Sequence, residues 1–388
     1  MNELKFDTVI HLTGEQVIPN CMAIKLSDCQ HHVFLATSKT KRTIQLLKNF
    51  FSDAPANFIE VREFPSSDYA EMVEATKSLA SEFSQERIGV NITGGTKLMF
   101  SAVLDMCREK DYHPFYVDTE NRHIQFLKAP FIRFKMPQVF DKVADFIKLA
   151  GYEVRVEGKI PSEALTIPER AFLRMAWSER DLMQMVVGDF AKVGEKGLSA
   201  ERREELYEQA ESRLDALVRM NQKRAMLYEQ YRRLCASEQG WLHVAAFMGG
   251  VWLEKWLIKS FSESKQAARF CDLRTGLTVR APQSSDSTRD VQELDMVFTD
   301  GYELYVFECK SGKVKQEYVQ KLENISRGLG GTFGHGILCS LNEPDEILRE
   351  RISLGSISSV SKEALESLPK NVFQVRPRKC YVRGKDFL

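Results

Sequence analysis

Runs of apolar, β-branched and aromatic residues alternate with amphipathic stretches over the first third of the chain. The runs predict strands at Thr8–Leu12, His32–Thr37, Phe58–Phe64, Ile88–Thr93 and Pro114–Asp118. The stretches predict helices at Thr40–Phe51, Tyr69–Phe83 and Lys97–Lys110, the second of them capped by Ser67 or Asp68. This alternation favours a mostly parallel sheet with helices on both faces. Ligands of such sheets bind beyond the carboxyl ends of the strands.

The middle of the chain, residues 136–239, has a different pattern. Tyr152–Val156 has the composition of one more strand, and the segment from Ile167 to about Ser237 is helical and highly charged. Ser199 is a good N-cap for a long helix with one apolar stripe. We expect a helical connector that relays changes between the parts on either side.

The pattern of apolar and polar residues from residue 240 onward predicts a helix, a hairpin, a second helix and a strand. Their ranges are Trp241–Ser262, Gln292–Phe298 with Tyr302–Lys310, Lys313–Leu329 and His335–Ser340. Thr299-Asp300-Gly301 is a strong turn signal. Folding about Asp300-Gly301 sets Thr299 opposite Tyr302 and Glu293 opposite Glu308.

Charged side chains share one face of this predicted hairpin. Because side chains alternate along a strand, Glu293, Asp295, Glu308 and Lys310 lie together, and the other face (Leu294, Met296, Phe298, Phe307 and Cys309) is apolar. The carboxylates repel one another, and a cation would hold them together. Asp295 and Glu308 can supply oxygen ligands to a divalent metal. Lys310 can position or deprotonate an attacking water. A bare Glu-x-Lys on a solvated strand is common, whereas here it follows an upstream acid and a hairpin.

This arrangement resembles the PD-(D/E)xK nuclease core. The resemblance implies an endonuclease dependent on Mg²⁺ or Mn²⁺ that cuts single-stranded DNA, RNA or both, or nicks duplex DNA. In many such enzymes an acid on the first core helix points at the metal, and Glu254 matches that position. Glu254 lies in the apolar stripe of Trp241–Ser262, where a lone carboxylate is costly to bury. The alternative is that it reaches solvent or pairs with an arginine.

Composition narrows the class of protein. The chain has 388 residues, of which 43% are hydrophobic and 28% charged, which is typical of a globular protein. No apolar run approaches ~18 residues and no signal core opens the chain, so we expect a cytoplasmic protein. The 8 cysteines form no Cys-x-x-Cys pair and predict reduced thiols. A net charge of zero leaves only local basic patches for nucleic acid: Lys313, Lys315, Lys321 and Arg327, and the tail from Arg376 to Lys385.

Two loops at the predicted strand ends carry unusual chemistry. Thr13-Gly14-Glu15-Gln16 follows the first strand, and Asn91-Ile92-Thr93-Gly94-Gly95-Thr96-Lys97 leads from the fourth strand into a helix. Glycines allow close approach of a ligand, and the helix N-terminus attracts phosphate. Thr93, Thr96 and Lys97 add side-chain donors. The alternative is a plain turn whose glycines serve packing. The spacing fits neither a P-loop nor Gly-x-Gly-x-x-Gly, which disfavours a dinucleotide oxidoreductase.

The motif from Asn91 to Lys97 resembles the signature of CARF domains. These domains of CRISPR systems dimerise and bind cyclic oligoadenylate across a two-fold axis. The resemblance implies ligand contacts from Thr93, Gly94, Gly95, Thr96 and Lys97, and from Thr13, Gly14, Glu15 and Gln16. It implies an α/β chain with a Rossmann-like CARF domain at 1–135, a helical connector at 136–239 and a PD-(D/E)xK domain at 240–388.

This combination resembles the ancillary nucleases of type III CRISPR systems that cyclic tetra-adenylate activates. We therefore expect a homodimer that binds this activator and then cuts nucleic acid, with no membrane partner. One alternative is a restriction or repair nuclease that cyclic oligoadenylate does not control. Another is a regulator that senses a nucleotide and binds DNA without cutting it.

Overall fold

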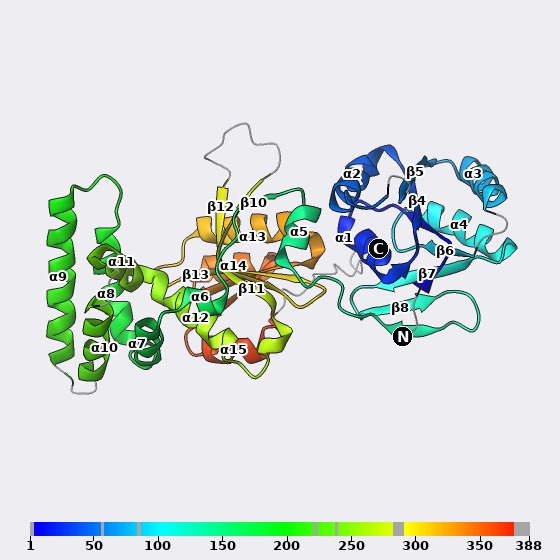
Figure 1. The fold of residues 1–388 in the computed structure, drawn as a ribbon. Coiled ribbons are helices and arrows are strands. Elements are labelled where there is room, and N and C mark those ends of the chain that lie inside the picture. Colours follow the sequence, from blue (N-terminus) through cyan, green and yellow to red (C-terminus); the bar gives the residue numbers. More distant parts are fainter. Residues whose placement is uncertain are drawn as a thin grey trace.

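The structure is a computed structural model that describes residues 4–55, 58–83, 87–219, 221, 224–236, 240–281 and 291–375. The predicted basic tail from Arg376 to Lys385 lies outside these residues. The described elements form two α/β domains, each on its own large sheet, and a helical bundle (Figure 1). No described helix is long and apolar enough to cross a membrane.

The first domain contains a sheet of order β5-β4-β2-β6-β7-β8-β9. The strands are β2 Thr8–Leu12, β4 His31–Ala36, β5 Ile59–Glu63, β6 Ile88–Asn91, β7 His113–Asp118, β8 His123–Phe126 and β9 Arg133–Lys135. The strands from β5 to β7 pair in parallel, as the alternation predicted, and β8 and β9 extend the sheet as antiparallel strands. The short β1 (Leu4–Lys5) and β3 (Ser27–Asp28) pair separately.

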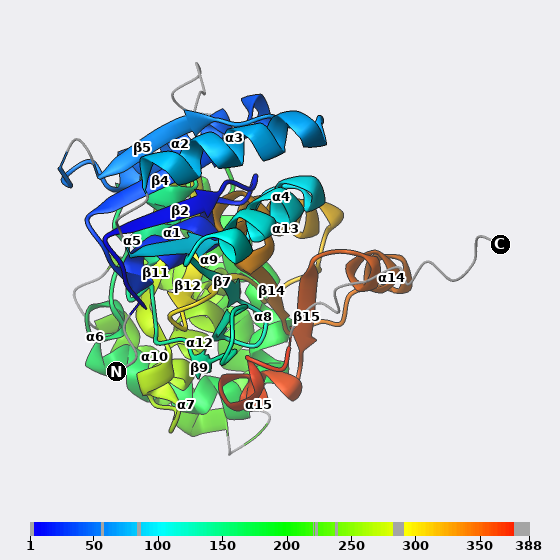
Figure 2. The ribbon, with the colours of Figure 1, turned by 90° about the vertical axis from the view of Figure 1, so that its right-hand side faces the viewer.

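Helices cover both faces of this sheet, which faces the viewer in Figure 2. They are α1 Val17–Leu26, α2 Lys41–Phe50, α3 Tyr69–Glu82 and α4 Lys97–Glu109. α3 and α4 pack on the side of Ile10 and Leu12, and α1 and α2 on the side of Val9 and Phe34. Of the two predicted caps of α3, Asp68 is used: its side chain accepts from the Glu71 amide at 3.0 Å. The sequence analysis missed α1, because its residues are apolar around most of the helix.

The second domain contains a sheet of order β10-β11-β12-β13-β14-β15. Its strands are β10 Glu153–Val156, β11 Cys271–Arg280, β12 Val291–Thr299, β13 Leu304–Lys310, β14 Gly334–Ser340 and β15 Ile357–Ser361. Pairing is antiparallel from β10 to β13 and parallel from β13 to β15. β10 is the strand predicted at Tyr152–Val156, and its pairing with β11 places the start of region 136–239 in the second sheet.

Helices also cover both faces of the second sheet. α12 (Trp252–Ser262) packs with the core that contains Met296 and Phe307, and α13 (Gln316–Gly330) packs with the core that contains Val306. α14 (Glu346–Leu354) and α15 (Ala364–Asn371) complete the domain. The predicted helix Trp241–Ser262 is interrupted: a π-helical turn at Phe247–Val251 separates α11 (Gly240–Ala246) from α12, and Gly250 there has a non-helical backbone.

The helical segment contains the predicted helices, and its role as a relay stays a prediction. Its helices are α7 Ile167–Ser178, α8 Arg180–Val193, α9 Ala200–Arg219 and α10 Arg224–Ala236. They form a bundle at the end of the second domain that points away from the first (Figure 1). Their apolar stripes pack against one another and against α12, where the rings of Trp177 and Trp256 stack at 3.6 Å. The two α/β domains touch directly, and the Val139 and Phe140 amides donate to Gly301 O at 2.9 and 3.0 Å.

Candidate active site and ligand-binding loops

The register of the β12–β13 hairpin differs by two residues from the prediction. Thr299 pairs with Leu304, and the pairing continues to Met296 opposite Phe307. The turn contains four residues, 300–303, because Asp300 Oδ1 accepts from the Tyr302 and Glu303 amides at 3.1 and 2.9 Å. A register shift of two residues leaves every side chain on the same face of the sheet. Asp295, and not Glu293, therefore falls level with Glu308.

The two strands of the hairpin part at the site. Beyond Met296, β12 stays paired only with β11, as far as Val291 opposite Arg280. β13 stays paired with β14 as far as Lys310 opposite Ser340. The Cys309 amide, which would continue the hairpin ladder, donates to Asp295 Oδ2 at 2.7 Å. The carboxylate thus lies in the fork between the diverging strands.

The strand alternation also breaks at Asp295. Met296, Phe298, Phe307 and Cys309 share one apolar core, as predicted, but Leu294 packs in the core on the opposite side. The break lies across from Gly276 of β11, whose φ is +65°. Such a backbone conformation is easy only for glycine. The predicted apolar face is therefore correct except at Leu294.

Three of the predicted catalytic side chains meet in the fork. Lys310 Nζ lies 2.7 Å from Glu308 Oε1 and 3.8 Å from Asp295 Oδ2. Lys321 Nζ of α13 lies 3.7 Å from Glu308 Oε2. The side chains of Asp295 and Glu308 are only 13% and 7% exposed, which strengthens the charge interactions between them. Lys310 Nζ also lies 4.9 Å from the centre of the Tyr318 ring.

Glu254 of α12 interacts electrostatically with the acidic site. Burial, and then the charge of Asp295, raise the pKa of Glu254 to about 8; Glu293 and Glu308 add to the effect, and Lys310 opposes it. Burial, and then Glu308, raise the pKa of Asp295 to about 6. Burial alone would lower the pKa of Lys310, but Asp295 and Glu308 outweigh it and raise that pKa. Negative charge is therefore unfavourable here and a cation is favoured.

The donor set fits a hard divalent metal. Asp295, Glu308 and Glu254 present carboxylate oxygens, which magnesium and manganese prefer. Within the described part of the chain, no three His, Cys, Asp or Glu side chains lie close enough together to hold a metal ion. An Mg²⁺ site needs only one or two carboxylates, because this ion retains several waters.

The two predicted ligand loops lie side by side in the first domain, because β2 and β6 are parallel neighbours. A Cβ at Gly94 would overlap Leu12 O and come within 2.6 Å of Gly14 N. Gly95 has φ +78°, which favours glycine. The two glycines therefore serve loop packing as well as any close approach of a ligand.

The polar residues of these loops divide into internal and exposed ones. Thr93 Oγ1 donates to Asn91 Oδ1 at 2.6 Å and accepts from the Val117 amide at 2.9 Å, so its hydroxyl is used inside the domain. Thr96 Oγ1 caps α4 by accepting from the Met99 amide at 3.3 Å. Lys97 and Glu15 are exposed. Thr13 is buried, and its hydroxyl has no hydrogen-bond partner. Gln16 Oε1 accepts from Thr332 Oγ1 of the second domain at 2.7 Å.

The sequence analysis missed a buried polar chain behind these loops. The Thr93 amide donates to Asn91 Oδ1, which fixes the orientation of the Asn91 side-chain amide. Asn91 Nδ2 therefore donates a hydrogen bond to His11 Nδ1 at 3.2 Å. His11 Nε2 then donates to His32 Nδ1 at 2.9 Å. Burial lowers the pKa of both imidazoles, that of His32 to about 4, so both are neutral. The sequence feature that could have revealed this hydrogen-bonded chain is a histidine within each of two otherwise apolar strands, β2 and β4.

Comparison with known families decides what the two domains are. The Card1 CARF domain family matches residues 8–142, and the Card1-like endonuclease domain family matches residues 243–374. The chain is a CARF-domain protein with a Card1-like endonuclease domain. The CARF match contains both ligand loops, and the endonuclease match contains the fork and α12. No curated protein matches the chain.

Solved structures share this two-domain fold. Can2 from Sulfobacillus thermosulfidooxidans, in complex with cyclic tetra-adenylate, has 18% identity and a TM-score of 0.69, over 95% of this chain and 99% of that one. VC1899 from Vibrio cholerae has 15% identity and a TM-score of 0.74, over 95% and 97%. A type III CRISPR defence DNA nuclease activated by cyclic oligoadenylate has 15% identity and a TM-score of 0.55, over 96% of this chain but 52% of that one. At these identities the likeness concerns the fold.

Proposed function

We propose that the protein is a metal-dependent endonuclease that cyclic tetra-adenylate activates in CRISPR antiviral defence. The observation that carries the proposal is the convergence of Asp295, Glu308 and Lys310 in the fork of an endonuclease domain that is joined to a CARF domain. The cyclic tetra-adenylate complex of Can2, which has the same fold, supports the choice of activator. A homodimer would bring two copies of the ligand loops together.

Asp295 and Glu308 would hold Mg²⁺ or Mn²⁺, with Glu254 as a third acid. Such an ion supplies charge that activates a water and neutralises the scissile phosphate. Asp295 and Glu308 raise the pKa of Lys310. Its ammonium would donate hydrogen bonds that orient a water or a phosphate oxygen.

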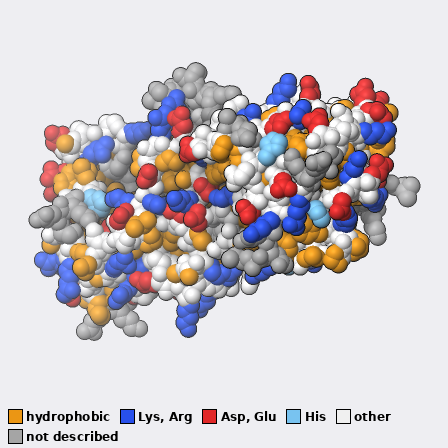
Figure 3. Space-filling view, turned by 45° about the vertical axis from the view of Figure 1, so that its right-hand side comes forward, with side chains coloured by type: hydrophobic (Ala, Val, Ile, Leu, Met, Phe, Trp, Pro, Cys, Tyr) orange, Lys and Arg blue, Asp and Glu red, His pale blue; other side chains and the backbone are white. Residues whose placement is uncertain are grey.

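The substrate that we propose is single-stranded DNA, RNA or both, with nicking of duplex DNA as a further activity. On the face drawn in Figure 3, basic and acidic side chains are interspersed, so a broad basic track does not dominate it. Nucleic acid would be held locally by Lys321, which lies in the site, and by the exposed Lys313 and Lys315.

The direct test measures cleavage of single-stranded DNA and RNA by the full chain, with and without cyclic tetra-adenylate, in Mg²⁺, Mn²⁺ or EDTA. We expect cleavage only with both activator and metal. Asp295→Asn and Lys310→Ala should each reduce cleavage by roughly a hundredfold or more, because they remove charge that acts on the transition state. Both variants should bind the activator as the wild type does, since the loops lie in the other domain.

Two outcomes would contradict the proposal. Full cleavage without cyclic tetra-adenylate would favour a restriction or repair nuclease. Binding of the activator and of DNA, with no cleavage in any metal, would favour a regulator that does not cut.

A further inference from the structure

The turn of the catalytic hairpin is buried against the CARF domain. Hairpin turns usually face solvent, but Asp300 and Tyr302 are 4% and 7% exposed. The segment after β9 wraps this turn: Gln138 Nε2 donates to Asp300 O at 3.1 Å, and Tyr302 Oη donates to Met136 O at 2.8 Å. The far end of the same hairpin carries Asp295 and Glu308.

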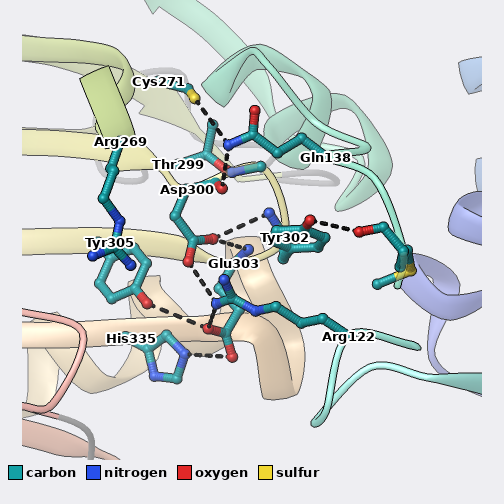
Figure 4. Close-up of polar contacts among 12 residues, drawn as sticks. Arg122, Gln138, Arg269, Cys271, Thr299, Asp300, Tyr302, Glu303, Tyr305 and His335 are labelled. Atoms are coloured by element: carbon teal, nitrogen blue, oxygen red, sulfur yellow. Dashed lines mark hydrogen bonds and ion pairs between the residues drawn. The ribbon is translucent and has the colours of Figure 1, made fainter. Parts of the chain in front are cut away.

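One CARF side chain forms ion pairs with both carboxylates of this turn. Arg122, between β7 and β8, places Nη2 at 2.6 Å from Asp300 Oδ2 and 3.1 Å from Glu303 Oε2, and its guanidinium lies 4.3 Å over the Tyr302 ring (Figure 4). The side chains of Asp300 and Glu303 are 3% and 13% exposed. Behind them, His335 Nε2 lies 3.2 Å from Glu303 Oε1. Two largely buried carboxylates thus share one guanidinium from the other domain. Removing the guanidinium would leave both carboxylates without this partner, which is costly for buried charges.

A continuous series of contacts joins the ligand loop to this turn. The Thr93 hydroxyl accepts from the Val117 amide in β7, and the turn that carries Arg122 follows β7 directly. From Arg122 the contacts pass to Asp300 and Glu303, and then along the paired residues of β12 and β13 to the fork. Asp295 is five residues from Asp300, or roughly 17 Å along a strand.

We propose that Arg122 is a positioning residue for cleavage, through which the CARF domain sets the catalytic hairpin. A ligand at Thr93–Lys97 moves β7, Arg122 moves with it, and the hairpin shifts Asp295 and Glu308 at its open end. This inference rests on the proposed function. A chain of contacts does not by itself establish coupling, so the test measures coupling separately from stability.

The test compares Arg122→Met with Lys25→Met in the full chain. Lys25 of α1 makes a second interdomain ion pair, with Asp145 of α5 (Val143–Leu149) at 3.0 Å, and within the described residues its contacts are with Asp145 and the rings of Phe50 and Phe140 rather than with the hairpin. Three quantities are measured: the unfolding midpoint, the affinity for cyclic tetra-adenylate, and the ratio of cleavage rates of a single-stranded DNA reporter in Mn²⁺ with and without that activator.

Arg122→Met should lower the activation ratio by roughly tenfold, the size of a typical coupling between sites. Its affinity for cyclic tetra-adenylate should stay within about twofold of wild type. The affinity and the activation ratio of Lys25→Met should also stay within about twofold, because the ion pair of Lys25 and Asp145 does not include the hairpin. Arg122→Lys should give an intermediate ratio, since one ammonium cannot hold two carboxylates as a planar guanidinium does.

Equal activation ratios in Arg122→Met and Lys25→Met would overturn the inference and leave the proposed function intact. A wild type that the activator does not stimulate would overturn both. If Arg122→Met does not fold, Glu303→Gln replaces it, because Arg122 then keeps Asp300. Its activation ratio should fall severalfold, and a wild-type ratio would count against the inference.

Discussion

At the scale of single residues, close packing decides what the glycines of the ligand loop do. Gly94 has no room for a Cβ between Leu12 O and Gly14 N. Gly94→Ala must therefore push the two loops apart, and we expect a loss of roughly 1–3 kcal/mol in stability, as for overpacked sites. Affinity for cyclic tetra-adenylate should fall as well, which calorimetric titration would measure.

A matched control for that variant is available in the helical bundle. Gly188 lies inside α8, and an added Cβ would meet nothing within 4 Å. Gly188→Ala should raise stability by about 1 kcal/mol, because alanine is the better helix former. Unchanged affinity and stability in Gly94→Ala would show that the loops tolerate separation.

Single residues also set a pH dependence in the CARF domain. Burial, and then His31, lower the pKa of His32 to about 4 in the folded protein, whereas the unfolded value is about 6.5. Below the unfolded value, the unfolded chain binds the proton and the folded chain does not, so stability is lost as pH falls. The loss attributable to His32 should be about 2 kcal/mol at pH 5.

Urea unfolding at pH 7 and pH 5 would measure this loss. His32→Phe should reduce the difference between the two pH values, while substitution of His123 in β8, which lies outside the buried chain, should not. If His32→Phe unfolds with the wild-type pH dependence, His32 does not remain neutral in the folded domain.

At the scale of elements, the bundle of α7 to α10 packs against α12. Trp177 stacks on Trp256 of α12, and both rings are nearly buried. Trp177→Leu should lower the free energy of unfolding by about 2–4 kcal/mol, as large-to-small core substitutions do. The activation ratio of the variant at a temperature where it is folded should stay as in wild type. A selective loss of the activation ratio, without destabilisation, would instead support the bundle as a relay.

The helices and strands differ in how well the local sequence pattern predicted them. The parallel strands of the first domain and the helices α2, α3 and α4 were predicted nearly to the residue, because their periodicity and caps are local. β11, β15 and α14 were missed. The predicted single helix before the hairpin is broken at Phe247–Val251, next to glycines whose conformation depends on what packs there.

At the scale of the whole molecule, the two domains are joined through a short segment and a few polar contacts. The CARF domain holds the turn of the catalytic hairpin through Arg122, and the Gln16 side chain touches Thr332 beyond α13. The helical segment that separates the domains in sequence lies to one side in space (Figure 1). Coupling between the sites is therefore expected to be direct, domain against domain.

The sequence by itself indicated the chemistry: which side chains share a strand face (except at Leu294), where the glycine loop lies, and that Asp295, Glu308 and Lys310 lie together. It could do so because strand alternation has a period of two, and a register error of two residues leaves every face unchanged. Only the tertiary structure decided the register itself, the fork at Asp295, the approach of Glu254 and the contact of Arg122 with Asp300 and Glu303. These depend on residues far apart in the chain, whose burial and charge no local pattern records.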